Sequence, residues 1–376
     1  MSLTVCLSAN TLDYPNGGGH LWMHLNWALG LRAVGCQVIW LEGMNPGTPV
    51  PEVRASVAAL KSRLQPYGLA EQVALCTWTG EPVPPGAAVD CLSFDAATDA
   101  HLLVDLRYDI ASHVLARFRR TVLIDIDPGI LQYWLGQGQI PLAPHDLYFT
   151  IGETVGRPGA PFPDCGLRWH YTPPPVFLPE WPMTPSEPTA PYSTVSSWWG
   201  EWMECEGELF SNEKRTAFLD YVTLPTRTPV PLELALCIEE QPEVERPLLE
   251  GHGWRVQRAW DVTATPEQYR AYIQRSRGEF SCAKPACLRF QNAWISDRTL
   301  CYLASGKPAV VQHTGPSRFL PDAAGLFRFR TMDEAVQCLK TVEADYERHC
   351  RLARALAEEY FDARRIVGRL LERAFA

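Results

Sequence analysis

The segment Gly17-Gly18-Gly19-His20 places a permissive backbone beside a titratable side chain, after an apolar run at 3–9 and at the start of a helical pattern. Glycine lets the backbone take positive φ and approach a ligand closely. A helix start adds unpaired N–H groups and the positive end of a dipole. His20 could therefore serve as a general base towards an acceptor hydroxyl, since the pKa of imidazole lies near physiological pH. The alternative interpretation is a surface turn in which His20 only packs or caps.

A second set of such residues lies in the second half, where Ser296, Asp297 and Arg298 open a predicted helix at 296–304. A diphosphate at this helix start would find backbone N–H groups and a bidentate guanidinium. A small-residue turn and a buried strand follow at 305–312, which is how a parallel sheet forms a nucleotide site. In the alternative interpretation, Arg298 only pairs with Asp297 at the surface.

Two aspartates, Asp125 and Asp127, stand at the end of a predicted strand at 121–125 and before the turn signal Pro128-Gly129. Such a D-x-D pair can hold a divalent metal that bridges a donor diphosphate, as in GT-A glycosyltransferases. It can also cap the turn at the carboxyl edge of a sheet. We favour an acceptor-side or structural role over metal binding.

The elements that position these residues alternate between strands and helices, which is typical of a parallel sheet. In the first half the predicted strands are 3–9, 37–41, 73–77, 121–125 and 147–151, with a helix at 20–34. In the second half the predicted strands are 192–196, 232–238, 254–259 and 308–312, with helices at 213–221, 266–275, 296–304, 333–341 and 346–376. The periodicity of the last segment indicates packed amphipathic helices.

A proline-rich segment separates the two series. Its prolines are Pro173, Pro174, Pro175, Pro179, Pro182, Pro185, Pro188 and Pro191. Proline at this density excludes helix and central strand and makes a stiff extended connector. We predict a domain boundary here, the alternative being a surface loop within one domain.

Length and composition fit this organisation. The chain has 376 residues, 46 % of them hydrophobic and 20 % charged, which suits two globular domains without a large disordered fraction. The net charge of −9 argues against a broad basic surface for binding nucleic acid, although it does not exclude a local basic cleft. No apolar run is long enough to span a bilayer and no signal peptide is recognised, so we expect a cytoplasmic protein with cysteines as thiols.

Two segments resemble glycosyltransferases of the GT-B type. The first reads Gly17-Gly18-Gly19-His20, then Leu25, Leu29-Gly30-Leu31-Arg32 and Gly35-Cys36-Gln37-Val38-Ile39-Trp40-Leu41. It is most similar to the start of the peptidoglycan N-acetylglucosaminyltransferase that acts on lipid-linked precursors. In that family, and in plant-type natural-product glucosyltransferases, the matching loop borders the acceptor pocket.

The second segment reads Arg275-Ser276-Arg277-Gly278-Glu279-Phe280, Ser296-Asp297-Arg298 and Tyr302-Leu303-Ala304-Ser305-Gly306-Lys307-Pro308-Ala309-Val310-Val311. It is similar to the donor site of the large retaining GT-B family. Glu279, in a polar loop, matches the first of that family's paired glutamates. The second falls at Cys301, and Asp297, four residues earlier on the same helix face, could replace it. This departure leaves open whether the reaction retains or inverts configuration.

The resemblance implies an α/β fold of two facing Rossmann-like domains (GT-B), with the active site in the cleft between them. The expected parts are an acceptor-side domain at 1–172, a hinge at 173–191, a donor-binding domain at 192–345 and a terminal helical segment at 346–376. The terminal helix should cross back to the first domain.

Residues and resemblance together suggest three groups of site residues. The catalytic candidates are His20, Glu279 and Asp297. The donor-binding candidates are Lys214, Arg298, Ser296, Trp198, His313, Thr314 and Gly315. The acceptor-side candidates are Gly17, Gly18, Gly19, Asp125, Asp127 and Glu153, the last a further candidate base.

Each of several candidates also has a plainer interpretation. Lys214 could simply be solvated on its helix, although it matches a lysine that reaches the donor diphosphate in GT-B enzymes. Glu279 could cap or solvate a loop. Trp198 could stack a base or a sugar ring, or belong to the core.

The resulting expectation is a metal-independent glycosyltransferase of the hexosyltransferase type. It would use a nucleotide sugar, UDP-sugar above all, as co-substrate, and it would need no other cofactor. The acceptor is left open among small molecules, glycans and nucleic acid. Three alternatives remain: a metal-dependent transferase built on Asp125 and Asp127, a glycosyltransferase that modifies nucleic acid, and a non-catalytic nucleotide-sugar-binding protein.

Overall fold

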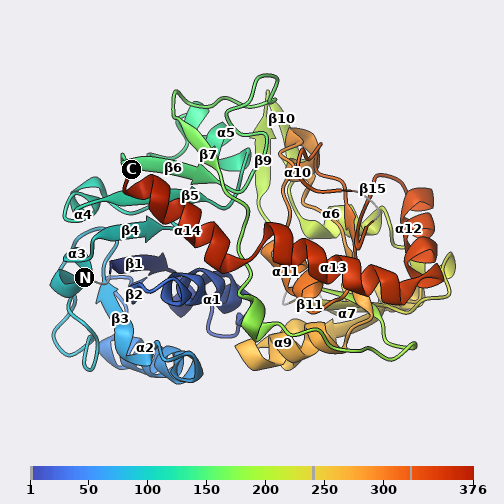
Figure 1. The fold of residues 1–376 in the computed structure, drawn as a ribbon, viewed down its shortest axis with the longest axis horizontal. Coiled ribbons are helices and arrows are strands. Elements are labelled where there is room, and N and C mark those ends of the chain that lie inside the picture. Colours follow the sequence, from blue (N-terminus) through green and yellow to red (C-terminus); the bar gives the residue numbers. More distant parts are fainter. Residues whose placement is uncertain (1–2, 239–241, 322–323) are drawn as a thin grey trace. The chain divides into compact units, whose positions relative to one another are not determined.

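The computed structural model describes residues 3–238, 242–321 and 324–376, and the chain divides into two compact units (Figure 1). The first unit comprises residues 1–177 and 363–376, and the second comprises residues 178–362. No helix in the described ranges is long and apolar enough to cross a membrane. The twelve cysteines are free thiols.

The first unit is built on a seven-stranded parallel sheet in the order β3-β2-β1-β4-β5-β6-β7. The strands are β1 (Thr4–Ala9), β2 (Gln37–Gly43), β3 (Val73–Cys76), β4 (Leu102–Asp105), β5 (Thr121–Asp125), β6 (Leu147–Thr150) and β7 (Trp169–Tyr171). The central strands are short runs rich in Val, Leu and Ile and are buried, as a parallel sheet covered on both faces requires. The order reverses between β1 and β4, where ligands bind in doubly wound folds.

The helices of this unit are α1 (Gly18–Ala33), α2 (Val50–Leu64), α3 (Phe94–Thr98), α4 (Ser112–Leu115), α5 (Ile130–Gly136) and α14 (Ala363–Ala374). The last helix, α14, belongs to this unit although the preceding residues belong to the other. It packs against α1, and the contact is close: a Cβ added at Gly30 would lie 2.9 Å from the Cβ of Ala363. The expected return of the terminal helix to the first domain is therefore confirmed.

The second unit has a six-stranded parallel sheet in the order β12-β11-β8-β13-β14-β15. Its strands are β8 (Tyr192–Ser197), β11 (Leu232–Cys237), β12 (Arg255–Arg258), β13 (Gly278–Ser281), β14 (Ala309–Gln312) and β15 (Leu326–Phe329). This is the strand order of the doubly wound dinucleotide-binding fold, and its switch point lies between β8 and β13. The predicted fold class, two Rossmann-like α/β domains, is confirmed.

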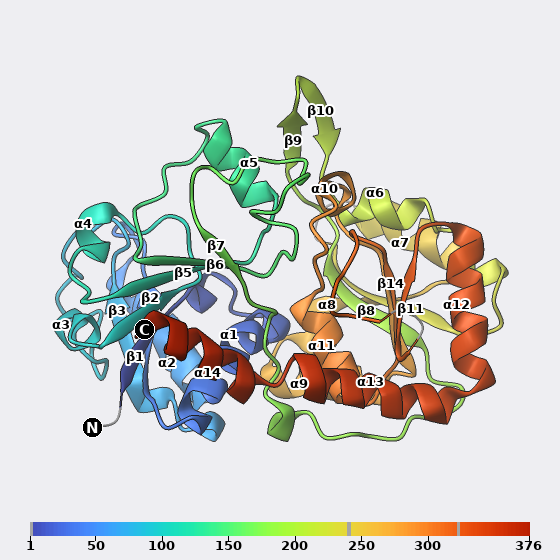
Figure 2. The same ribbon diagram turned by 45° about the horizontal axis from the view of Figure 1, so that its top comes forward.

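The helices of the second unit are α6 (Lys214–Leu219), α7 (Pro242–Gly251), α8 (Ala259–Thr263), α9 (Pro266–Arg275), α10 (Pro285–Phe290), α11 (Asp297–Ala304), α12 (Met332–Ala344) and α13 (Tyr346–Tyr360). A hairpin of β9 (Trp202–Cys205) and β10 (Glu208–Ser211) is separate from the main sheet. In Figures 1 and 2 the hairpin extends beyond the layers of its unit.

Side chains of the second unit bind the backbone of the proline-rich segment. Lys307 is fully buried and donates to the carbonyl oxygens of Thr184 (2.8 Å) and Pro185 (3.1 Å). Arg354 donates to the carbonyl oxygen of Trp181 at 2.8 Å. These bonds satisfy carbonyl groups that a proline-rich stretch cannot pair in a helix or a sheet.

Candidate functional site

Arg298 joins the carboxyl ends of two strands at the switch point of the second unit. Its guanidinium donates to the carbonyl oxygen of Val195 in β8 (3.0 Å) and to the hydroxyl of Ser281 in β13 (2.7 Å). The residue stands in the first turn of α11, where the Ser296 hydroxyl caps the helix by accepting from the Arg298 N–H at 3.3 Å. Ser296 and Arg298 thus meet where a doubly wound sheet binds its ligand.

The charge of Arg298 already has a partner. Its Nε donates to Oε1 of Glu279 at 2.8 Å, and both side chains are buried. Burial alone lowers the pKa of Arg298, but the Glu279 carboxylate together with Tyr269 and Tyr302 outweighs it, and the pKa is raised. Arg298 is therefore held rigidly in a neutral pair, and its remaining N–H groups can act as dipolar donors more than as a net positive charge.

Glu279 lies inside β13 and not in a polar loop, which corrects the sequence-based expectation. It is fully buried, and its Oε2 has no hydrogen-bond partner among the described residues. Its Oε1 orients the Arg298 guanidinium. Its role in holding a donor ribose or sugar stays a prediction.

Lys214 is a buried cation at the same edge of the sheet. It is the first residue of α6, and its Nζ donates to the carbonyl oxygen of Cys282, the residue after β13, at 2.5 Å. The Nζ also lies 5.8 Å from the centre of the Trp294 ring. Burial, with the charge of Arg298, lowers the pKa of Lys214 to about 7. An anion placed here would restore the proton, because an opposite charge favours the ammonium form.

A small cavity of about 20 Å³ opens at this edge, lined by Cys282, Trp294, Ser296, Arg298 and Thr314, among others. Three predicted donor-site residues, Ser296, Arg298 and Thr314, line it. Trp294, Cys282 and Gln312, which the sequence interpretation did not single out, line it too. The predicted order of strand, loop and helix indicated that a ligand site lies at this edge of the sheet. No sequence pattern indicated which loop residues line it.

The loop after β14 is hydrogen-bonded to the loop before α11. The Thr314 hydroxyl donates to the carbonyl oxygen of Trp294 at 2.6 Å, and the Gly315 N–H donates to Nδ1 of His313 at 3.1 Å. Gly315 has φ of +133°, and a Cβ there would lie 2.5 Å from the carbonyl oxygen of Gln291. Asp297 follows this loop, at the start of α11, and burial raises the pKa of its carboxyl.

Trp198 belongs to the core of the second unit. Its side chain is 0 % exposed, and its indole N–H donates to Glu245 at 3.0 Å. Its ring centre lies 6.0 Å from that of Phe218. No ring face is open to a base or a sugar, so the core interpretation replaces the stacking role.

In the first unit, His20 lies at the switch point between β1 and β4. Its Nε2 is 2.7 Å from Oδ1 of Asn10, the residue after β1. Its ring contacts those of Tyr14, in a tilted arrangement, and His24, edge to face, with centres 4.4 and 5.0 Å away. Burial, with a smaller contribution from the nearby Arg107, lowers the pKa of His20 to about 4, although a hydrogen bond with Asn10 opposes the shift. The imidazole is therefore neutral at physiological pH.

The three glycines do not take positive φ, contrary to expectation. Gly17 caps α1 with φ of −97°, and Gly18 and Gly19 are its first helical residues. Gly17 is needed for space: a Cβ there would lie 3.1 Å from the Cβ of Tyr14 and 3.2 Å from that of His20. The glycines therefore allow the helix start to come close to Tyr14.

Arg107 is a neighbour of His20 that the sequence interpretation missed. It follows β4, pairs with both carboxylate oxygens of Asp109 at 2.9 and 2.6 Å, and lies over the Trp78 ring at 5.0 Å. Its Nη1 is buried without a hydrogen-bond partner among the described residues. The chain carries no motif around Arg107, and only the topology places it near the switch point.

Asp125 and Asp127 cap the turn after β5. The buried Asp125 accepts from Gln132 (2.8 Å), Thr150 (2.7 Å) and the Asp127 N–H (2.9 Å), and burial raises its pKa to about 7. Tyr108 donates to both aspartates, at 3.4 and 3.3 Å. In the described ranges no group of three or more His, Cys, Asp and Glu side chains is placed to hold a metal ion. Glu153, beyond β6, is buried.

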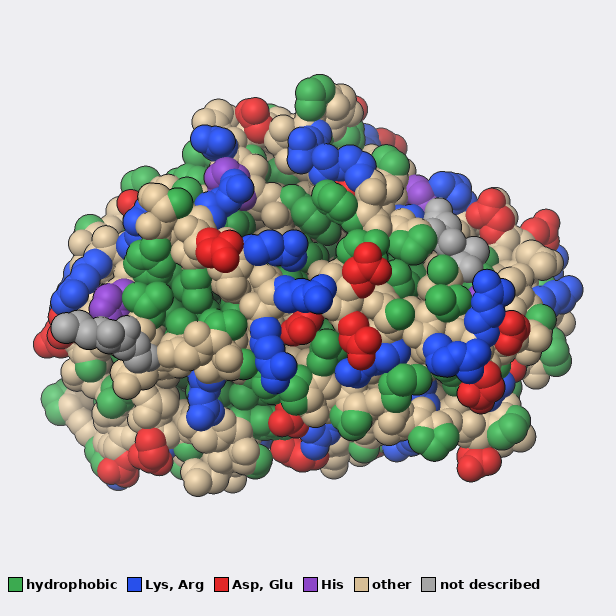
Figure 3. Space-filling model, viewed as in Figure 1, with side chains coloured by type: hydrophobic (Ala, Val, Ile, Leu, Met, Phe, Trp, Pro, Cys, Tyr) green, Lys and Arg blue, Asp and Glu red, His purple; other side chains and the backbone are tan. Residues whose placement is uncertain are grey.

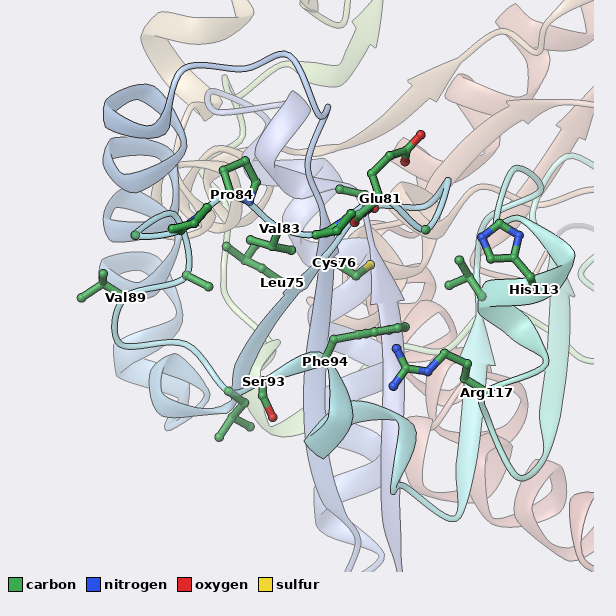
Figure 4. Close-up of a pocket in the computed structure, with 18 residues that line it drawn as sticks. Leu75, Cys76, Glu81, Val83, Pro84, Val89, Ser93, Phe94, His113 and Arg117 are labelled. Atoms are coloured by element: carbon green, nitrogen blue, oxygen red, sulfur yellow. Dashed lines mark hydrogen bonds between the residues drawn. The ribbon is translucent and has the colours of Figure 1, made fainter.

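A cavity of about 630 Å³ lies in the first unit, at the carboxyl end of β3 (Figure 4). Leu75 and Phe94 form apolar walls, His113 and Arg117 come from α4 and the turn after it, and the loop 80–93 closes the rest. Its volume is in the range of small-molecule sites. No sequence motif indicated it, because its walls come from a proline-rich loop without periodicity.

The two doubly wound sheets, with a C-terminal helix returned to the first, define the GT-B fold, and comparison with solved structures agrees. An α-glucosyltransferase in complex with UDP and a 13-mer DNA containing a HMU base superposes with a TM-score of 0.65 at 9 % identity, over 100 % of both chains. HepE from Anabaena in complex with UDP and glucose gives 0.56 at 12 %, over 99 % of both chains. A glycosyltransferase from Rickettsia africae gives 0.56 at 9 %, over 99 % of this chain and 98 % of that one. No protein-family model matches the sequence, and neither does any curated protein.

Proposed function

We propose that this protein is a glycosyltransferase that takes its sugar from a UDP-sugar bound by the second unit. The observation that carries the proposal is the cluster of Lys214 and the Arg298–Glu279 pair at the β8/β13 switch point. The likeness to GT-B structures that hold UDP supports it.

The cluster suits a diphosphate leaving group. Lys214 supplies the uncompensated charge, while Arg298 and the N–H groups at the start of α11 supply oriented donors. In the transfer, the bond between the anomeric carbon and the UDP oxygen breaks, and a bond from the acceptor oxygen to that carbon forms. Negative charge grows on the diphosphate in the transition state, so fixed positive groups lower the barrier.

The acceptor proton has two possible destinations. In an inverting reaction a base takes it, and the neutral imidazole of His20 in the first unit is our candidate. In a retaining reaction the departing phosphate can take it, and His20 then helps only to position the acceptor. Asp125 and Asp127 serve the turn in either case, and we propose that transfer needs no metal ion.

The acceptor is not a polyanion on this proposal. The net charge is −9, and on the face drawn in Figure 3 the basic side chains are interspersed with acidic ones and form no broad tract. Nucleic acid binding relies on such a tract to neutralise phosphates.

Isothermal titration calorimetry of UDP tests the donor site. UDP should bind the wild-type protein, and Lys214→Met should weaken binding by about 10- to 150-fold, since a charge-assisted hydrogen bond contributes about 1.5–3 kcal/mol. Lys340→Met, at an exposed position on α12, is the matched control and should bind UDP normally. Equal affinity of the folded Lys214→Met and Lys340→Met variants would reject the assignment.

A further inference from the structure

The β9–β10 hairpin stands directly beside the proposed donor site. It occupies residues 202–211, between the end of β8 at Ser197 and the start of α6 at Lys214. It is therefore an insertion in the first strand-to-helix connection of the second unit, at the carboxyl edge of the sheet. Figures 1 and 2 show it extending from that edge.

One face of the hairpin is exposed and carries large apolar side chains. Trp202 pairs with Ser211 and Leu209 pairs with Glu204, so these four side chains share a face. Trp202 is 62 % exposed and Leu209 is 64 % exposed. Glu204 is exposed too, with no ion pair or hydrogen bond of its side chain among the described residues. Trp202 and Leu209 thus offer apolar surface to a ligand on the same solvent-exposed face.

The other face holds the hairpin in place. Met203 and Cys205 are buried, and Arg289 from α10 donates to Glu208 at 2.8 Å while lying over the Phe210 ring at 5.1 Å. The turn residues Glu206 and Gly207 both have positive φ, 55° and 79°, as a two-residue hairpin turn requires. The exposed face is therefore presented by a supported element and does not need to be ordered on binding.

We propose that the exposed hairpin face (Trp202, Glu204, Leu209 and Ser211) binds the acceptor, and that the acceptor is a neutral glycan. The inference rests on the proposed function. An indole ring offers a flat apolar surface to the C–H face of a sugar ring, and Leu209 extends that surface. The Glu204 carboxylate can accept hydrogen bonds from sugar hydroxyl groups.

The charge of the hairpin decides against nucleic acid as the occupant. Glu204 lies on the exposed face, and Glu201, the residue before the hairpin, is exposed too. Arg289 pairs with Glu208 on the opposite face and with Glu206 in the turn, so it compensates neither Glu201 nor Glu204. Trp202 could stack a nucleobase, but each phosphate brought beside these carboxylates would be repelled. A neutral polyhydroxylated chain meets no such penalty.

Transfer assays with a donor that the protein accepts test the inference. The acceptors are a panel of neutral linear oligosaccharides of glucose, galactose and mannose, with a single-stranded 13-mer DNA as the polyanionic alternative. At least one oligosaccharide should be glycosylated. Trp202→Ala should raise KM for it about tenfold or more and leave UDP affinity unchanged. Trp260→Ala, at another exposed tryptophan of the same unit, is the matched control and should change neither.

Three outcomes would overturn the inference: transfer to DNA but to no oligosaccharide, no transfer to any member of the panel, or an unchanged KM in Trp202→Ala. UDP calorimetry on the same samples separates this failure from failure of the proposed function. Intact UDP binding with any of these outcomes rejects only the glycan site. Absent UDP binding rejects the donor site itself.

Discussion

At the scale of single residues, Lys214 and Arg298 differ in how they can meet an anion. Arg298 is compensated by Glu279, whereas Lys214 donates to a carbonyl oxygen and lies over the face of Trp294, with no ion pair among the described residues. The sequence predicted both as diphosphate ligands but gave no sign of this difference. Glu279 stands 19 residues before Arg298, so only the folded sheet brings them together.

The lowered pKa of Lys214 predicts proton uptake on UDP binding. At pH 8 a lysine with a pKa of about 7 is mostly neutral, and a diphosphate beside it should raise the pKa and draw in nearly one proton. Calorimetry at pH 8 in buffers of different ionisation enthalpy measures this uptake. A binding enthalpy that is the same in all buffers would contradict it, and Lys214→Met should show no uptake.

The buried pair of Arg298 and Glu279 predicts a non-additive stability change. Arg298→Met leaves a carboxylate buried without its partner and should lower the free energy of unfolding by about 3–5 kcal/mol. The double variant Arg298→Met/Glu279→Leu should recover most of that loss, because no charge is left uncompensated. Urea denaturation of the single and double variants gives the coupling. Additive losses would show that the two side chains do not act as a pair.

His20 makes a prediction about activity and stereochemistry. If it is the base of an inverting reaction, His20→Ala should lower turnover by about 10²–10⁴ and leave UDP affinity nearly unchanged. NMR of the anomeric proton then shows a product of opposite configuration to the donor. Retained configuration, or near-normal turnover in the variant, removes His20 from the catalytic residues.

The pKa of His20 also predicts the pH dependence. The folded value is about 4 and the unfolded value about 6.5, so the unfolded state binds more protons between these limits. The contribution of His20 to stability is therefore complete above pH 6.5 and is lost as pH falls towards 4. In His20→Gln the free energy of unfolding, measured by urea denaturation, should depend less on pH between 4 and 6.5. The same dependence on pH as in the wild-type protein would contradict the lowered pKa of a buried His20.

At the scale of elements, the contact of α14 with α1 depends on a glycine. Gly30→Ala would place a methyl group 2.9 Å from the Cβ of Ala363, so the helices must separate, and we expect a loss of about 1–3 kcal/mol. Gly368, inside α14, has no atom within 4 Å of an added Cβ. Gly368→Ala should instead stabilise the protein by about 0.5–1 kcal/mol, because alanine favours a helix. Thermal unfolding compares the two, and a shift of the same sign in both would contradict the close packing.

Several of the strands predicted from the sequence are runs of apolar residues that the fold buries throughout, although the equally buried β4 was missed. The runs at 121–125 and 232–238 were predicted as strands because they are short and apolar, which is typical of strands buried in a parallel sheet. β13 was missed because Glu279 makes it look polar, and its partner comes from a distant helix. The β9–β10 hairpin was missed because one face meets solvent and only Met203 and Cys205 are buried.

Candidate residues were harder to predict than elements, for a related reason. Trp198 and Asp125 are chemically capable side chains, yet contacts from residues remote in sequence make the first a core side chain and the second a turn cap. Arg107 and Trp294 belong to no sequence motif that would mark them as site residues. The sequence predicts the strand ends at which ligands bind. It does not predict which side chains there have no partner within the protein and can contact a ligand.

At the scale of the whole molecule, two sheets repeat one strand order, each with polar side chains at its switch point. The identity to known GT-B structures is 9–12 %, so this likeness establishes the fold. The donor-site chemistry rests on Lys214 and the Arg298–Glu279 pair themselves.

Release of UDP from a panel of UDP-sugars, measured with and without EDTA, tests whether this protein is a metal-independent glycosyltransferase. We expect the wild-type protein to release UDP from at least one UDP-sugar, faster in the presence of acceptor. Release should persist in EDTA and should fall strongly in Lys214→Met but not in Lys340→Met. Folded wild-type protein that releases UDP from none of the sugars, or only when Mn²⁺ or Mg²⁺ is restored after EDTA, would contradict it.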